Sequence, residues 1–149
     1  MQNETTHYDT LIFDLGGVII NLDTQATYRA FLAHNPKLAP EVIHHPATIR
    51  YEMGLISDAQ FRDEVRGFIS PRLSDQEIDD CWNAMIGDIP AWRIQMLQAL
   101  RSKHQLFLLS NTNSIHMRRV TKEVVVHGLE SLDVLFDKSY YSHKMNKRK

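Results

Sequence analysis

The sequence predicts an α/β fold in which a helical insertion interrupts a parallel sheet. Two short apolar runs, 11–20 and 106–109, are rich in the Leu, Ile, Phe and Val that are typical of buried parallel strands. Between them, residues 24–88 contain helical periodicities and caps but no comparable run. A helical domain inserted into a strand–helix–strand pattern explains this order better than a linker does, because the insertion carries its own apolar periodicity.

The composition restricts the class of protein. A chain of 149 residues with 43% apolar residues suits one domain, or one domain with a modest insertion. The formal net charge of -1 gives no reason to expect a nucleic acid or an anionic membrane as partner, and the run 11–20 is too short to span a bilayer. The single cysteine, Cys81, excludes an internal disulfide and favours a reducing compartment, and we therefore expect a cytoplasmic protein.

The first apolar run carries one charge, Asp14, and two glycines, Gly16 and Gly17, follow it. We expect a strand that is buried on both faces, with a carboxylate at its end that is costly to desolvate unless it has a partner or a task. The glycines allow a sharp turn and a close approach of a ligand to main-chain N–H groups. Ligands of α/β folds bind beyond the carboxyl ends of strands, so this is a candidate active-site edge. A plain core strand in which Asp14 caps a turn is the alternative.

The insertion is predicted to be helical. Asp23 or Thr24 caps a first helix that begins near Gln25. Residues 35–48 contain three prolines and are expected to form a loop, in which the adjacent His44 and His45 indicate a surface position rather than a metal site. Capping boxes then begin two further helices, at 57–60 and 74–77, and Cys81 is expected to be a core thiol of the second.

The second apolar run ends in Ser110, Asn111, Thr112 and Asn113, just before a helix predicted from Ser114 to about Val126. A helix N-terminus with a preceding hydroxyl is a recurrent anion-binding arrangement, although a simple N-cap cluster is the commoner explanation for such residues in isolation. Gly128 is expected to end this helix, and 140–142 to form a third strand. For the basic residues 144–149, a solvated tail is the default expectation.

Taken together, these residues resemble the haloacid-dehalogenase-like (HAD) hydrolase superfamily, and especially its small phosphatases with a helical cap. Three stretches match in order: 12–18, 108–113 and 142–149. Segments 51–54 and 56–58, together with 81–85, also resemble the cap of glucose-1-phosphate-type phosphatases. The resemblance covers nearly the whole chain and implies a Rossmannoid core of residues 1–23 and 89–149 with a cap of residues 24–88.

The resemblance also implies a chemistry. Asp14 would attack the phosphorus of a small phosphorylated metabolite, with sugar phosphates as one candidate class, and water would hydrolyse the aspartyl-phosphate. Mg²⁺ would be the cofactor, bound by the Asp14 carboxylate and the main-chain carbonyl of Gly16. The implied catalytic residues are Asp14, Ser110 as phosphoryl ligand and Lys149 as phosphate-binding lysine. The implied substrate-binding residues are Leu15, Gly16, Gly17 and Asn111.

The chain departs from the family pattern at Gly16, where these phosphatases usually carry an aspartate that protonates the leaving group. Some members of the resembled subgroup share the glycine. Asp23 is one candidate replacement for the acid. Dehalogenases and phosphonatases of the superfamily also lack that aspartate, so their chemistry stays open as an alternative.

A second departure is that no acidic pair follows Lys149, where the family places further Mg²⁺ ligands. We therefore expect a fragment of a longer protein of roughly 200 residues, with weak metal binding and little activity. Without further strands the first strand would also present an unpaired edge, a route to self-association. The remaining alternative is a non-catalytic HAD-like binding module.

Overall fold

The computed structural model describes residues 8–39 and 44–149, and its architecture is α/β. Three parallel strands form one sheet in the order β1–β2–β3, with β1 at Thr10–Phe13, β2 at Gln105–Ser110 and β3 at Lys138–Tyr141. Ile12 pairs with Phe107, and Phe107 pairs with Lys138. The predicted fold class is therefore confirmed, with a third strand that begins two residues and ends one residue earlier than expected.

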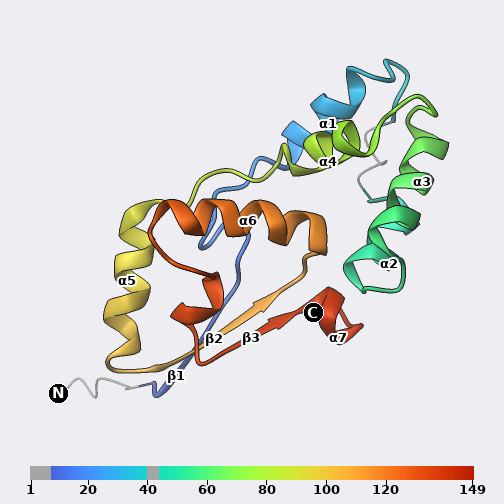
Figure 1. The fold of residues 1–149 in the computed structure, drawn as a ribbon. Coiled ribbons are helices and arrows are strands. Elements are labelled where there is room, and N and C mark those ends of the chain that lie inside the picture. The colour runs from blue at the N-terminus through green and yellow to red at the C-terminus, as the bar shows by residue number, and fades with distance from the viewer. Residues whose placement is uncertain (1–7, 40–43) are drawn as a thin grey trace, which may run out of the picture.

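The helices fall into two groups (Figure 1). Helices α1–α4 lie together at the end of the molecule toward which β2 and β3 point, whereas α5 and α6 lie along the sheet. No helix in the described part of the chain is long and apolar enough to cross a membrane. The bounds are α1 Thr24–Leu32, α2 Pro46–Glu52, α3 Asp58–Phe68, α4 Asp75–Asn83, α5 Ala91–Arg101, α6 Ser114–Val126, the 3-10 helix η2 Leu132–Leu135 and α7 Ser142–Met145.

Two separate apolar clusters fill the interior. The sheet cluster lies between the sheet and helices α5 and α6, and the helical cluster lies among α1–α4. The sheet cluster consists of Leu15, Ile19, Ile20, Ile86, Ile89, Ile94, Leu97, Leu106, Leu108, Val120, Val124, Leu132, Leu135, Phe136 and Tyr141. The helical cluster consists of Phe31, Leu38, Ala47, Tyr51, Phe61, Val65, Ile69, Leu73, Ile78, Cys81, Trp82 and Ile115.

Helix α6 belongs to both clusters. Ile115 in its first turn packs into the helical cluster, whereas Val120 and Val124 pack into the sheet cluster. The helix that follows β2 therefore connects the two interiors along its length. Cys81 is buried in the helical cluster, which confirms it as a core thiol.

The expectation of strands buried on both faces is wrong for β1. Ile12 is 68% exposed, while Leu106 and Leu108 on β2 are fully buried. Alternate residues of a strand point to opposite faces, and in the described residues the apolar packing covers the face that carries Leu106 and Leu108. An apolar run by itself does not distinguish a strand with two covered faces from a strand with one.

The local helix signals are largely confirmed. Ser57 and Ser74 form complete capping boxes with Gln60 and Glu77, and Asp23 caps α1 by accepting a hydrogen bond from the Gln25 N–H. The expected loop at 35–48 is wrong at its end, because α2 begins at Pro46. Proline fits the first turn of a helix, where its missing N–H has no intrahelical partner. The part of this loop at 40–43 lies outside the described residues.

Candidate active site

Asp14 and Ser110 lie at the same edge of the sheet. Asp14 directly follows β1, and Ser110 is the last residue of the adjacent parallel strand β2, whose Leu108 pairs with Phe13. Ser110 is buried and lines a cavity of about 140 Å³ together with Leu15 and Gly16. The Asp14 side chain does not itself line this cavity, although the two residues that follow it do.

Lys149 converges on the same place. Its Nζ lies 2.6 Å from Asp14 Oδ2 and donates to the Leu109 carbonyl oxygen at 3.0 Å. The Asn111 side chain fixes the main chain of Lys149, because Asn111 Oδ1 accepts from the Lys149 N–H at 3.0 Å. The basic residue that resembled a family lysine is thus placed at the end of β1, and the default expectation of a solvated tail is wrong for Lys149.

The glycine turn after Asp14 is built as expected at one position. Gly17 has φ +73°, a left-handed conformation that favours glycine, and its N–H donates to the Ile20 carbonyl oxygen at 2.8 Å. The Leu15 N–H donates to Asp14 Oδ1 at 2.7 Å. A Cβ added to Gly16 would lie 2.5 Å from Leu22 Cδ1, so any side chain here requires Leu22 to move. Gly16 has no side chain, so position 16 offers no side-chain group that could protonate a leaving group.

The loop after β2 is held by Ser142, a residue for which the sequence predicts no role. Ser142 is buried at the start of α7, and its Oγ accepts from the Thr112 N–H at 2.9 Å and donates to the Thr112 carbonyl oxygen at 3.0 Å. This pair of hydrogen bonds ties the third matched stretch to the second. Ser142 is the first residue of that third stretch, which was the available signal.

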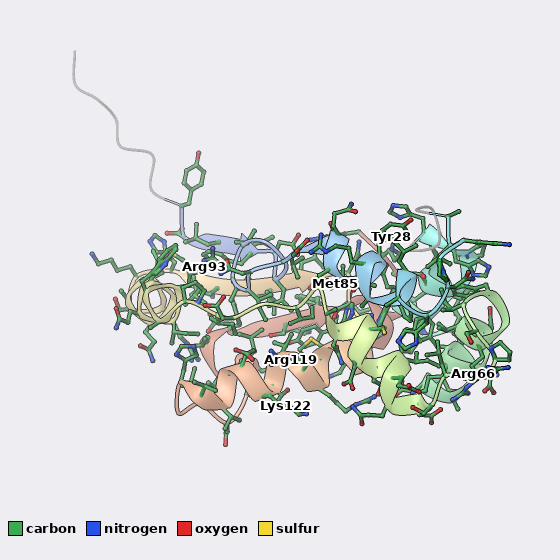
Figure 2. All side chains as sticks on the ribbon, turned by 90° about the horizontal axis from the view of Figure 1, so that it is seen from above. Tyr28, Arg66, Met85, Arg93, Arg119 and Lys122 are labelled. Carbon is green, nitrogen blue, oxygen red and sulfur yellow. The ribbon has the colours of Figure 1, made fainter. Side chains whose placement is uncertain are left out.

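A second cavity of about 370 Å³ opens among the helices. Residues of α1, α2, α4 and α6 contribute to it, and Glu52, Met85 and His116 line both cavities. Met85 also packs against the sheet cluster and lies near the middle of the molecule in Figure 2. The remaining residues of the second cavity are Thr24, Gln25, Thr27, His44, Thr48, Ile49, Trp82 and Arg148.

His116 is a buried histidine with both ring nitrogens engaged. Its Nε2 lies 3.0 Å from the Trp82 carbonyl oxygen, and its Nδ1 lies 3.2 Å from the Asn113 side-chain nitrogen. The ring also stacks on the Trp82 indole, with centroids 5.1 Å apart. Burial disfavours the charged form and lowers the pKa of His116 to about 4. His116 is therefore neutral near pH 7 and connects α6 to α4.

The sequence-based candidate for the missing acid, Asp23, is wrong. Its carboxylate is well exposed, caps α1 and pairs with Arg29 at 2.5 Å. The Arg29 guanidinium lowers the pKa of Asp23, and Asp23 lines neither cavity described above. Helix capping alone accounts for an aspartate at this position.

The residues fit a loosely held magnesium ion. Asp14 offers a carboxylate and Gly16 a main-chain carbonyl, both oxygen ligands of the type that Mg²⁺ prefers. Within residues 8–39 and 44–149 there is no group of three or more His, Cys, Asp or Glu side chains suited to a metal. Mg²⁺ commonly keeps several waters and binds through one or two carboxylates plus substrate phosphates. Asp14 and the Gly16 carbonyl therefore provide only the smallest number of protein ligands that is usual for this ion.

Comparison with solved structures gives close matches over nearly the whole chain. A HAD family enzyme of Bacteroides thetaiotaomicron in its magnesium complex superposes with a TM-score of 0.86 and 36% identity, covering 95% of this chain and 70% of that one. An aspartate-to-alanine variant of that enzyme with magnesium and inorganic phosphate gives 0.85 and 33%, covering 96% and 72%. A HAD-like family hydrolase of Porphyromonas gingivalis gives 0.81 and 31%, covering 94% and 69%.

Among curated proteins, the chain is similar to a D-ribitol-5-phosphate phosphatase of Bacteroides thetaiotaomicron. The identity is 24% over an alignment 143 residues long, which covers 93% of this chain and 69% of that protein. No family model matches the chain. The structural matches exceed 30% identity and extend over more than two thirds of each matched enzyme. With the strand order, the glycine turn and the convergence of Asp14 and Lys149, they establish that this chain belongs to the HAD family of enzymes.

Proposed function

We propose that this chain is a Mg²⁺-dependent hydrolase of small phosphorylated metabolites that acts through an aspartyl-phosphate on Asp14. The observation that carries the proposal is the pairing of Lys149 with Asp14 at the carboxyl end of β1, beside the end of β2 where Ser110 lies. A nucleophile, a hydroxyl donor and a cation at one sheet edge suit phosphoryl transfer, in which positioning and charge stabilisation dominate.

Each residue has a separate role in this mechanism. The Asp14 carboxylate attacks phosphorus in line with the leaving oxygen, while the Ser110 hydroxyl and the Lys149 ammonium hold phosphoryl oxygens. Asn111 keeps Lys149 in place through its hydrogen bond to the Lys149 N–H. Mg²⁺, bound by Asp14 and the Gly16 carbonyl, would supply further neutralisation of phosphoryl charge. The turn residues Leu15, Gly16 and Gly17 bring main chain close to the substrate without a bulky side chain.

The second cavity supports a polyol or sugar phosphate as substrate. The polar residues Thr24, Gln25 and Thr48 are among those that line it, and such residues suit a leaving group rich in hydroxyls. The name of the curated relative, D-ribitol-5-phosphate phosphatase, agrees with this class. In this proposal residues 24–88 act as a cap over a core of residues 1–23 and 89–149, and the two apolar clusters support that division.

We propose further that the 149-residue chain binds Mg²⁺ weakly and turns over slowly, because the described residues bring one carboxylate to the metal site. We also propose a cytoplasmic location, which agrees with the free buried thiol of Cys81. The exposed Ile12 on the outer strand β1 supports association between copies of the chain.

The test is release of inorganic phosphate from D-ribitol 5-phosphate with Mg²⁺ in large excess. Asp14→Asn should abolish turnover, and Ser110→Ala should lower kcat by about 10²-fold, as expected for loss of one transition-state donor. Asp80→Asn, on the exposed side of α4, is the matched control and should leave the rate unchanged.

Three results would contradict the proposal. Turnover that survives Asp14→Asn would exclude the aspartyl-phosphate. Release of halide from a 2-haloacid, or of phosphate from a phosphonate, without phosphatase activity would favour the carbon-centred chemistry that Gly16 leaves open. The absence of all turnover, with ligand binding unaffected by Asp14→Asn, would favour a binding module.

A further inference from the structure

Glu52, the last residue of α2, lies where the two cavities meet. Three residues line both the cavity at the strand ends and the cavity among the helices: Glu52, Met85 and His116. Met85 carries no exchangeable proton, and both ring nitrogens of His116 already have partners. Glu52 is thus the shared side chain that can give and take a proton at the junction between the two cavities.

The end of α2 is fixed on both sides of Glu52. The preceding residue, Tyr51, accepts a hydrogen bond from the Ile115 N–H at 3.2 Å, which ties it to α6. The following residue, Met53, accepts at its carbonyl oxygen from the Asn146 side chain at 3.0 Å, just after α7. These contacts hold Glu52 at a defined position against the core, as a residue that acts on substrate requires.

Gly54 allows the end of α2 to lie close to α7. A Cβ on Gly54 would lie 2.1 Å from the His143 carbonyl oxygen, and Gly54 has φ +66°. A side chain at this position would therefore separate α2 from α7 and move Glu52 away from the strand ends. The segment 51–54 is fitted to the core residues that carry Lys149.

The surroundings of Glu52 suit a carboxyl group that cycles between two charge states. Its side chain is 19% exposed, and Oε2 lies 2.9 Å from Arg148 Nε. Burial raises the pKa of Glu52, while the positive charges of Arg148 and His44 act in the opposite direction and only partly offset it. A half-buried carboxyl whose pKa is raised by desolvation can give a proton to a leaving group and take one back from water.

We propose that Glu52 protonates the leaving-group oxygen, the task that the side chain at position 16 performs in relatives with an aspartate there; this inference rests on the proposed function. As Asp14 bonds to phosphorus, the bond from phosphorus to the ester oxygen breaks, and that oxygen takes its electron pair and the Glu52 proton. Water then attacks the aspartyl-phosphate and gives a proton to the Glu52 carboxylate. The Asp14–phosphorus bond breaks, which restores Asp14 and releases phosphate.

The decisive experiment compares two leaving groups in Glu52→Gln. D-ribitol 5-phosphate releases an alkoxide that must be protonated, whereas 4-nitrophenyl phosphate releases an anion that is stable without a proton. We expect kcat/KM for D-ribitol 5-phosphate to fall by about 10²–10⁴-fold. For 4-nitrophenyl phosphate we expect a change below about 10-fold, since the acid contributes little to its departure.

Arg148→Met separates catalysis from anchoring, because it leaves the Glu52 carboxyl in place and removes its cationic partner. With wild type, kcat/KM for D-ribitol 5-phosphate should decrease as pH rises through the pKa of Glu52. In Arg148→Met this decrease should move to higher pH, because the cation that favours the carboxylate is gone, and in Glu52→Gln it should disappear. His44 and His116 remain unchanged in both variants.

Equal losses on both substrates in Glu52→Gln, reproduced by Arg148→Met, would overturn the inference, because Glu52 would then only anchor Arg148. Absence of phosphate release from both substrates in wild type, or release that survives Asp14→Asn, would overturn the proposed function instead. If Glu52→Gln fails to show a wild-type circular dichroism melt, Glu52→Asp replaces it. Glu52→Asp keeps a carboxyl, and we expect it to retain part of the wild-type activity on D-ribitol 5-phosphate. If Glu52→Gln folds and is as active as wild type on that substrate, Glu52 is not the acid.

Discussion

The sheet cluster and the helical cluster are stabilised in different ways. The sheet cluster is mostly aliphatic and packs along the covered face of three strands. The helical cluster has an aromatic centre, in which Tyr51 stacks on Phe61 at 4.2 Å and Phe61 contacts Trp82 at 4.9 Å. Ion pairs surround that centre, with Arg62 bidentate to Asp79. A short strand needs a sheet to bury its side chains, whereas short helices bury theirs around a few large rings.

The junction between the clusters combines the apolar packing of Ile115 from α6 with several hydrogen bonds. The Trp82 carbonyl contacts His116, the Tyr51 hydroxyl accepts from the Ile115 N–H, and Asn146 donates to Met53. Apolar packing holds each part together, and the two parts are joined both by the side chains that α6 packs into each cluster and by these hydrogen bonds. This difference matters for function, because the residue proposed as acid, Glu52, belongs to one part and the proposed nucleophile, Asp14, to the other.

The largest expected effect comes from removing the aromatic centre. Phe61→Ala deletes a fully buried ring and should lower the free energy of unfolding by about 3–5 kcal/mol. Because α6 belongs to both clusters, we expect one urea transition observed equally by circular dichroism and tryptophan fluorescence. Leu97→Ala in the sheet cluster is the matched control, with a loss of about 2–5 kcal/mol. Two separated transitions would mean that the clusters unfold independently.

The next effect is on pH dependence. The pKa of His116 is about 4 in the folded chain and 6.5 without burial, so the unfolded chain binds more protons between these values. The free energy of unfolding should therefore decrease as pH falls from about 6.5 to about 4, by about 3 kcal/mol from this residue. Urea titrations at several pH values check this. In His116→Gln the free energy of unfolding should depend less on pH between about 4 and 6.5. An unchanged pH dependence would show that His116 is not its source.

A smaller effect is expected at the junction itself. Tyr51→Phe keeps the ring stack but removes a hydroxyl that bonds to Asp58, Ser114 and the Ile115 N–H. Leaving these groups without a partner should lower the free energy of unfolding by about 1–3 kcal/mol. Tyr28→Phe, whose hydroxyl has one carbonyl partner, is the control and should cost less. A Tyr51→Phe loss no larger than the control would show that the polar junction contributes little.

The smallest effect is expected on the open face of the sheet. Ile12→Thr changes a largely exposed side chain and keeps β-propensity, so the free energy of unfolding should change by less than about 0.5 kcal/mol. Leu108→Ala, on the covered face, should lose about 2–5 kcal/mol. A large loss for Ile12→Thr, together with a dimer in sedimentation velocity that the variant dissociates, would show that another copy covers this face.

Local signals in the sequence predicted much of the fold. The capping boxes at Ser57 and Ser74, the extent of α6 and the two main strands follow from short-range chemistry and are present as expected. Helix α2 was missed because prolines before it indicated a loop, and a seven-residue helix has too little periodicity to overrule them. The exposure of Ile12 was missed because an apolar run does not record which face is covered.

The sequence by itself determined which residues end the strands, and so placed Asp14 and Ser110 at one edge, since parallel strands share the direction of their carboxyl ends. Only the tertiary structure brought Lys149 to Asp14 and Glu52 to the junction of the two cavities. These contacts join segments far apart in the chain, and the place of Glu52 depends on how α2 packs against α7 and the residues after it rather than on any local preference. Helix capping and strand patterning act over a few residues. The position of Glu52 depends instead on the contact between α2 and α7, and local sequence patterns do not predict which helices pack together.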